Sequence, residues 1–182
     1  MTQTDRSAPP LNTSDLLIRK VDRPDLEALE WDGEFLKYRR MYAEIFHTSK
    51  AGKSLMWLVE LPGVAVLGQA FVLLNSVDVD AADGVSRAYL FAFRVKPQWQ
   101  NRGIGQYLMQ FIEQDLQKRG FRYVTLNVAR NNLDAIRLYQ RIGYKIIGPR
   151  SGLWSYRDHE GRLQQVNEPS WRMMKRIGEK RD

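Results

Sequence analysis

A predicted strand, a glycine-containing turn and a helix start follow one another between Phe93 and Gln106, and this order constrains the chain more than any other feature. The apolar run that begins at Phe93 leads into a polar turn with Gly103 and Gly105, and an apolar helical period starts directly after it. Glycine lets the backbone come close to a ligand, and the free N–H groups of a helix start point toward an anion. The stretch therefore predicts a site for a ligand that carries phosphate.

Composition limits the other possibilities. At 182 residues the chain suits one domain with a substantial core, and its 43% apolar and 27% charged residues are typical of a globular protein. The lack of cysteine excludes disulfides and a cysteine nucleophile, and only His47 and His159 could bring imidazole to a metal site. We therefore expect no bound metal.

The net charge of +7 favours an anionic partner, which could be nucleic acid, a membrane surface or a phosphorylated cofactor. Apart from Lys175, Arg176, Lys180 and Arg181, the basic residues are scattered, whereas a nucleic-acid footprint usually clusters on one face. We therefore favour an anionic cofactor and expect no nucleic-acid partner. No apolar run approaches the ~20 residues that span a bilayer, and the N-terminus has no signal-peptide core, so we expect a cytoplasmic protein without a membrane partner.

Hydrophobic periodicity predicts a single domain of the α/β (α+β) class. Residues 1–13 are polar and are expected to form a flexible tail, and residues 14–178 form the domain. A first helix should start at Asp22 and end at Gly33, and a second, amphipathic helix should run from Phe35 to Phe46. Further helices are expected over 104–119 and 132–142, and strands over 16–21, 55–61, 64–74, 88–95, 123–128, 144–147, 153–156, 163–166 and 171–177. We expect a mixed, mostly antiparallel sheet of about seven strands, flanked by helices and closed by the last strand.

Two common phosphate-binding templates do not fit the glycine turn. The chain has no Gly followed after four residues by Gly-Lys-Ser/Thr, which excludes a P-loop. A dinucleotide-binding fingerprint would need a third glycine where Leu108 stands. Both of these nucleotide folds are therefore excluded.

The segment Gln100–Gly105 reads Gln-Asn-Arg-Gly-Ile-Gly, which matches the pattern Gln/Arg-x-x-Gly-x-Gly/Ala. Here the chain resembles the GCN5-related N-acetyltransferase (GNAT) family, whose pyrophosphate-binding loop has this form. The segment Asn132–Tyr139, followed by Ile142-Gly143-Tyr144, resembles the family's Asn-x-x-Ala-x-x-Leu-Tyr…Gly-Phe/Tyr segment. The spacing between the two motifs leaves room for one helix and one strand, and the order of elements after the tail also agrees with the family.

The resemblance implies acetyl-CoA, or another acyl-CoA, as the donor of an acyl group. It implies that strand 88–95 splays away from strand 123–128, and that pantetheine lies in the gap. The residues expected to bind the cofactor are Phe93, Val95, Gln100, Asn101, Arg102, Gly103, Ile104, Gly105, Gln106 and Asn132. Phe93 and Val95 would use backbone groups, Arg102 would add charge near the pyrophosphate, and Asn132 could equally serve as the cap of its helix.

The implied reaction is direct attack of a primary amine on the thioester. Tyr139 stands where family members place the acid that protonates the thiolate, although it could also be a core tyrosine. The N–H of Val95 is a candidate for stabilising the oxyanion. The general base stays open, because strand 88–95 contains no carboxylate. Candidates by charge alone are Glu34, Glu44, Glu60 and Asp78, and a chain of water molecules is an alternative.

The acceptor is not identified by any motif. Five aromatic residues could line its site or belong to the core: Trp31, Tyr38, Tyr42, Trp57 and Trp154. An aromatic surface with nearby acids would suit an amine-bearing small molecule, a polyamine or a peptide amine, and a homodimer is compatible with this reading. The alternative function is a non-catalytic acyl-CoA-binding sensor or interaction module.

Overall fold

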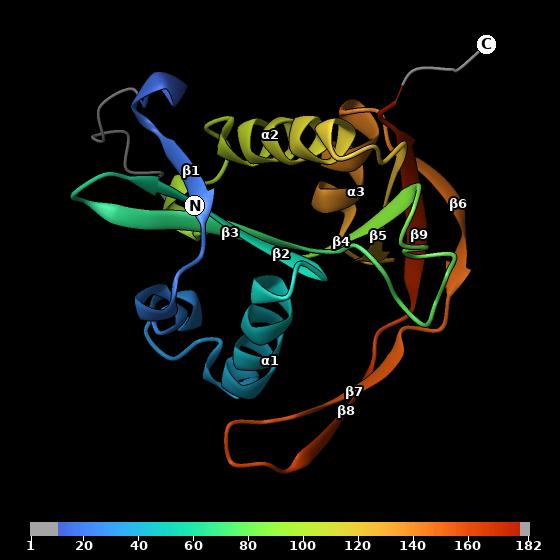
Figure 1. Cartoon of the computed structure of the whole chain (residues 1–182), viewed down its shortest axis with the longest axis horizontal. Coiled ribbons are helices and arrows are strands. Elements are labelled where there is room, and N and C mark those ends of the chain that lie inside the picture. Colours follow the sequence, from blue (N-terminus) through green and yellow to red (C-terminus); the bar gives the residue numbers. More distant parts are fainter. Residues whose placement is uncertain (1–10, 179–182) are drawn as a thin grey trace, which may run out of the picture.

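The computed structural model describes residues 11–178 as a central sheet with helices on both faces (Figure 1). The tail expected over residues 1–13 falls almost entirely outside the described residues, and Thr13 already begins a short 3₁₀ turn, η1 (Thr13–Asp15). The seven strands lie in the order β1 (Leu17–Lys20), β2 (Ser54–Leu61), β3 (Ala65–Leu73), β4 (Arg87–Val95), β5 (Tyr123–Ala129), β9 (Ser170–Arg176) and β6 (Lys145–Arg150). Only the pair β4–β5 is parallel, which confirms a mixed, mostly antiparallel sheet.

Two apolar clusters hold the layers together. Helices α2 (Ile104–Lys118) and α3 (Leu133–Arg141) cover one face, where Leu108 and Ile112 pack against Val124 and Leu126 of β5. Helix α1 (Arg39–Lys50) covers the opposite face through a second cluster, and we call this opposite face the α1 face (Figure 1). The two sides of the sheet are therefore available for different tasks. None of the helices described here has the length and apolarity to cross a bilayer.

The prediction of a first helix from Asp22 to Gly33 is wrong. Asp22 does accept a hydrogen bond from the N–H of Arg23 and forms a capping box with Asp25, but the chain then makes only the short 3₁₀ turns η2 (Arg23–Leu26) and η3 (Ala28–Glu30). Trp31 and Asp32 follow with left-handed φ values of 48° and 57°. An α-helix cannot continue through two such residues.

Two other expectations need correction. The second helix begins at Arg39, after the 3₁₀ turn η4 (Leu36–Tyr38), and not at Phe35. The last strand, β9, does not close the sheet but lies between β5 and β6, so β6 is the edge. Strands β7 (Leu153–Arg157) and β8 (Leu163–Asn167) form a separate hairpin that reaches below the main sheet toward α1 (Figure 1).

The loop between β3 and β4 folds over the sheet through a network around Asp83. Its carboxylate accepts hydrogen bonds from the N–H groups of Val85, Ser86 and Arg87. The hydroxyl of Thr125 in β5 donates to the carbonyl of Ala81 at 2.7 Å. These bonds hold the loop against the start of β4 and over part of the α1 face.

Candidate active site

Strands β4 and β5 separate in the middle of the sheet. Their parallel pairing ends at Leu90 and Leu126, although β4 continues to Val95 and β5 to Ala129. Backbone groups of β4 beyond Leu90 therefore have no partner in β5. This separation, which we call the β4–β5 split, is the splaying that the family resemblance implies.

A β-bulge in β4 lies directly beside the split. Gln69 pairs with Arg94 and Phe71 with Phe91, so Ala92 and Phe93 together oppose the single residue between Gln69 and Phe71. Ala92 has a φ of 50°, which is uncommon for a residue other than glycine. Bulges and strained backbone of this kind concentrate at functional sites.

The bulge leaves the end of β4 facing the split. The N–H of Lys96 donates to the carbonyl of Leu67 in β3 at 2.8 Å. Because backbone groups alternate sides along a strand, those of Val95 and Phe93 point away from β3 and toward the split. The carbonyl of Val95 accepts a hydrogen bond from the side-chain amide of Gln100 at 2.9 Å. Gln100 thus ties the glycine turn to β4.

The glycine turn positions the start of α2 without a side-chain cap. Gly103 occupies the N-cap position with a φ of 80°, and no side chain of the described residues caps the helix. The first helical bond runs from the N–H of Tyr107 to the carbonyl of Gly103. The N–H groups over 104–106 therefore have no helical partner and are available to an anion. The guanidinium of Arg102 lies 5.2 Å from the ring centre of Trp99 beside this turn.

Gly105 lets α2 approach β4. A Cβ atom at this position would lie 3.2 Å from Cζ of Phe93 and 3.8 Å from Cγ2 of Val95. The first contact is tighter than most Cβ contacts, so a side chain here would push the helix start away from the split. Gly103 thus serves the left-handed conformation of the turn, whereas Gly105 allows the close approach of α2 to β4.

Helix α3 places Tyr139 beside the same strand. Asn132 caps the helix, and its side chain accepts a hydrogen bond from the N–H of Ala135 at 3.2 Å. The ring of Tyr139 lies 6.1 Å from that of Phe93 and 5.8 Å from that of Tyr144. Burial, and to a smaller extent the charge of Tyr89, raises the pKa of the Tyr139 hydroxyl. This phenol therefore stays protonated at neutral pH.

The four carboxylates considered as general base have other positions. Glu34 and Glu44 are exposed, and Glu60 accepts hydrogen bonds from Arg19 near the edge of the sheet. Asp78 lies near the split, where it accepts a hydrogen bond from Arg172 that lowers its pKa. None of the four is thus a carboxylate free to take a proton at the split.

The α1 face of β4 carries an arginine that sequence reasoning missed. Nη1 of Arg94 donates to the hydroxyl of Tyr42 at 2.9 Å. Its guanidinium lies 4.1 Å from the ring centre of Phe35 and 5.5 Å from that of Tyr38. The visible signal was an arginine within an otherwise apolar strand, which needs a specific environment.

A second missed arginine lies on β9. Arg172 is only 2% exposed, and its Nε donates to Oδ1 of Asn127 at 2.6 Å. Its guanidinium lies 5.6 Å from the ring centre of Tyr89, whose ring stacks on Phe91 at 5.9 Å. Asn127 is the first residue of β5 after its pairing with β4 ends, so Arg172, its partner in β9, lies on the α1 face at the start of the split.

The five aromatic candidates separate into two groups. Trp57 is buried on the other face of the sheet, where it packs against Phe111 of α2 at 5.0 Å, so it belongs to the core. Tyr38, Tyr42 and Trp154 gather on the α1 face, and Tyr38 lies 6.3 Å from Trp154 of the β7–β8 hairpin.

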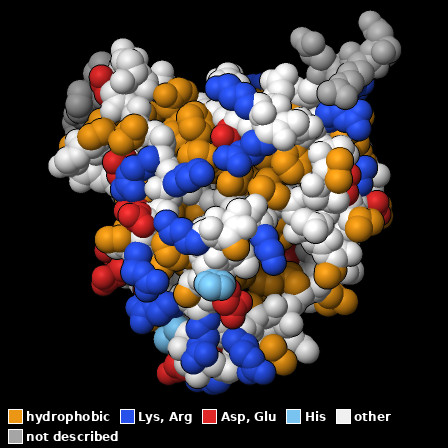
Figure 2. Space-filling view, viewed as in Figure 1, with side chains coloured by type: hydrophobic (Ala, Val, Ile, Leu, Met, Phe, Trp, Pro, Cys, Tyr) orange, Lys and Arg blue, Asp and Glu red, His pale blue; other side chains and the backbone are white. Residues whose placement is uncertain are grey.

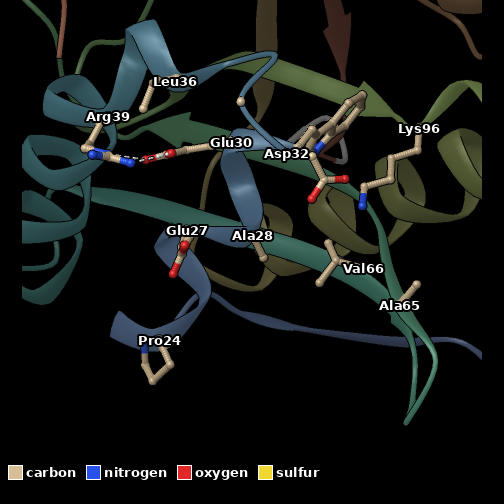
Figure 3. A pocket seen from close by; sticks show the side chains of 12 residues that line it. Pro24, Glu27, Ala28, Glu30, Asp32, Leu36, Arg39, Ala65, Val66 and Lys96 are labelled. Atoms are coloured by element: carbon tan, nitrogen blue, oxygen red, sulfur yellow. Dashed lines mark hydrogen bonds and ion pairs between the residues drawn. The ribbon is translucent and has the colours of Figure 1, made fainter.

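Trp31 lines a cavity of about 650 Å³ on the α1 side of the sheet. In Figure 3 the cavity lies between the 3₁₀ turns and the start of β3, with Ala65, Val66 and Lys96 on one side. Glu30 and Arg39 point toward each other at the opposite end from Lys96 and form an ion pair at 2.6 Å. Trp31 therefore belongs to a neighbouring cavity rather than to the aromatic group around Tyr38.

Comparison with known proteins agrees with this architecture. A family model described as Acetyltransferase (GNAT) family matches residues 23–144. The ribosomal protein bS18-alanine N-acetyltransferase of Escherichia coli K12 is 35% identical over 60 residues, which cover 33% of this chain and 40% of that protein. The spermine/spermidine N(1)-acetyltransferase of Bacillus subtilis is 31% identical over 90 residues, which cover 49% of this chain and 55% of that protein. The chain thus spans about half, or less, of the length of these relatives.

Solved structures share the fold at low sequence identity. The ribosomal-protein-S18-alanine N-acetyltransferase of Escherichia coli matches with a TM-score of 0.65 and 20% identity, over 91% of this chain and 96% of that one. An N-acetyltransferase from Staphylococcus aureus Mu50 matches with a TM-score of 0.69 and 16% identity, over 89% and 98% of the two chains. Since the family model covers more than half of the residues, this chain belongs to the GNAT acetyltransferase family.

Proposed function

We propose that this protein transfers an acetyl or other acyl group from acyl-CoA to a primary amine. The observation that carries the proposal is the β4–β5 split directly beside the uncapped start of α2. The split offers unpaired backbone groups to an amide-containing arm, and the helix start offers free N–H groups to an anion. Pantetheine and pyrophosphate are the two corresponding parts of coenzyme A.

The residues present fit this donor. The backbone of Phe93 and Val95 faces the split, and the N–H groups over 104–106 lack helical partners. Arg102, beside Trp99, adds positive charge near the turn. Gln100 and Asn132 contribute by holding the turn and capping α3, which keeps the two helix starts in place.

The donor supplies a thioester, whose C–S bond breaks as the amine nitrogen forms a new N–C bond. Tyr139 is the candidate donor of a hydrogen bond to the departing sulfur, because its ring lies 6.1 Å from that of Phe93 beside the split and its raised pKa keeps the hydroxyl protonated. Since a thiol with a pKa near ~8.5 is a stronger acid than this phenol, the role we propose for Tyr139 is a hydrogen bond that stabilises the departing thiolate rather than full proton transfer. The N–H of Val95 is the candidate donor to the oxyanion.

The acceptor binds on the α1 face, where the aromatic group around Tyr38 adjoins the split. Both relatives named above act, by their names, on amines: a protein alanine and the polyamines spermine and spermidine. These names support a primary amine as acceptor in this chain. Since no free carboxylate lies at the split among the four candidates, we propose that water carries the amine proton away.

Calorimetric titration with acetyl-CoA, followed by a thiol-release assay with a panel of amines, tests the proposal. The variant Tyr139→Phe should lower kcat by ~10²-fold or more and leave the affinity for acetyl-CoA nearly unchanged. Tyr123→Phe is the matched control, because Tyr123 lies at the end of β5 away from the split, and it should retain full turnover.

Each result separates the alternatives. Absence of acetyl-CoA binding at high micromolar concentration would refute the proposed donor. Binding without thiol release by any amine would favour the non-catalytic sensor. Unchanged turnover in Tyr139→Phe would remove this residue from the mechanism.

A further inference from the structure

We propose that the amine accepted by this protein carries a carboxylate, which Arg94 and Arg172 bind on the α1 face beside the β4–β5 split. The inference rests on the proposed function and deepens it by naming the acceptor class. It disagrees with a polyamine, one of the three acceptors expected for an aromatic surface with nearby acids.

Arg172 supplies the first observation. Its Nε donates to Asn127 and its Nη2 donates to Asp78 at 2.8 Å, whereas Nη1 is buried and has no hydrogen-bond partner among residues 11–178. A buried donor on a charged group loses its hydration and costs free energy unless a partner is supplied. Arg172 is the partner of Asn127 in the β5–β9 pairing. Asn127 is exposed and is the first residue of β5 within the split. A bound anionic oxygen would supply the hydrogen-bond acceptor that Nη1 lacks.

Arg94 supplies the second observation, from the other side of the split. It makes one side-chain hydrogen bond, to Tyr42, and forms no ion pair with any carboxylate of the described residues. The rings of Phe35 and Tyr38 hold its guanidinium in place without using its N–H donors. A planar guanidinium held in this way is preorganised for bidentate binding of a carboxylate.

The two arginines flank the place where the acceptor must lie. Arg94 is two residues beyond Ala92, the strained residue of the bulge, and Arg172 pairs with Asn127, the first residue of β5 within the split. Between them, the stacked rings of Tyr89 and Phe91 form an apolar floor that is partly accessible. An amine directed into the split would therefore place a carboxylate of the same molecule within the reach of these guanidiniums.

The carboxylates near these arginines leave the charge of Arg94 without an ion pair. Asp78 is engaged by Arg172, and its pKa is lowered mainly by that hydrogen bond. Glu168 lies in the connection between β8 and β9 and is exposed to solvent, which screens its charge. Figure 2 shows that Lys and Arg side chains spread over this view and gather over α1 and the β7–β8 hairpin. Asp78 compensates the charge of Arg172, so Arg94 is the guanidinium here without an ion pair among residues 11–178, and its repulsion disfavours the positive charges of a polyamine.

Three amines of equal chain length test the inference on the wild-type protein: 4-aminobutyrate, butylamine and 1,4-diaminobutane. Thiol release should show a kcat/KM at least tenfold higher for 4-aminobutyrate than for either other amine. Peptides with a free N-terminal alanine, ending in a carboxylate or an amide, extend the same comparison. If the neutral amine or the diamine reacts as well as 4-aminobutyrate, the inference is overturned and the proposed function stands.

Variants assign the effect to the arginines. Arg94→Gln should reduce the preference for 4-aminobutyrate over butylamine by tenfold or more, mainly through KM, and Arg94→Lys should restore part of it. Arg172→Lys keeps a charge in the floor and should retain the fold, with a smaller loss of preference. Arg141→Gln, on the exposed end of α3, is the control and should keep the wild-type ratio.

The outcomes for the two proposals can be distinguished. If the wild-type protein does not bind acetyl-CoA, the donor site is refuted and with it the proposed function. If acetyl-CoA binds but no amine reacts, ligand-observed NMR in the presence of CoA compares binding of the three amines directly. Equal binding of 4-aminobutyrate and butylamine, or an unchanged ratio in Arg94→Gln, would overturn the inference.

Discussion

Replacing Gly68 with alanine should destabilise the fold because β3 and β4 approach each other closely at this point. A Cβ atom on Gly68 would lie 2.5 Å from the carbonyl oxygen of Arg94 and 3.2 Å from Cα of Val95. Both atoms are backbone, so no side-chain rotation relieves the contact. Ordinary contact begins at 3.4 Å, and β4 would have to move by roughly 0.9 Å.

The cost follows from the bonds that hold β4 at this point. The hydrogen bond from the N–H of Lys96 to the carbonyl of Leu67 is 2.8 Å long, and such a movement would stretch it beyond useful length. Overpacking costs ~1–3 kcal/mol and a lost hydrogen bond ~1 kcal/mol, so we expect a loss of ~2–4 kcal/mol in the free energy of unfolding. For a chain of this length the Tm should fall by about 4–16 °C.

Gly148→Ala is the matched control. Gly148 also lies in a strand and has no left-handed φ, but its Cβ would meet only Nη1 of Arg150, at 3.9 Å. This change should leave stability unchanged or raise it by up to about 1 kcal/mol. Thermal and urea denaturation give both values, and calorimetry with acetyl-CoA should show weaker binding for Gly68→Ala, because Val95 faces the split. Equal stability of the two variants would refute the reasoning.

Three further predictions concern the turn, the α3 cap and acid stability. Gly103→Ala should weaken acetyl-CoA binding and cost ~1–2 kcal/mol of stability because its φ is 80°, as calorimetry and denaturation would show. Asn132→Ala should cost ~1 kcal/mol by removing the cap, whereas Asn132→Asp should not, in the same denaturation assay. Burial opposes ionisation of Asp158, but hydrogen bonds from Arg162 and Gln164 lower its pKa to about 2. Its stabilising effect is therefore present above pH 4 and is lost toward pH 2, and Asp158→Asn should flatten the dependence of Tm on pH in that range.

Local signals predicted the glycine turn, the start of α2 and the cap of α3. The glycines of the turn, the apolar period of α2 and the cap at Asn132 lie within a few residues of the groups that they position. Their effects come from backbone conformation, which neighbouring residues determine. The same signals failed for the helix expected from Asp22, because Asp22 does cap a turn but Trp31 and Asp32 adopt left-handed conformations that no local pattern indicated.

The α1 face beside the β4–β5 split depends on contacts between distant segments. Arg94, Arg172, Asp78 and Tyr42 come from four separate parts of the chain, and only the order of the strands brings them to one face. Insertion of β9 between β5 and β6 places Arg172 beside the split, whereas the sequence suggested that the last strand closes the sheet. The bulge at Ala92 likewise arises from pairing with β3 and leaves no mark in the residues of β4 alone.

The sequence by itself thus indicated the family and the residues of the helix start, because these depend on short motifs and short-range backbone geometry. The tertiary structure decided where β4 and β5 separate, which aromatic residues lie outside the core, and which charged residues line the α1 face. Those properties depend on burial and on pairing between strands far apart in the chain, and the acceptor that we propose rests on them.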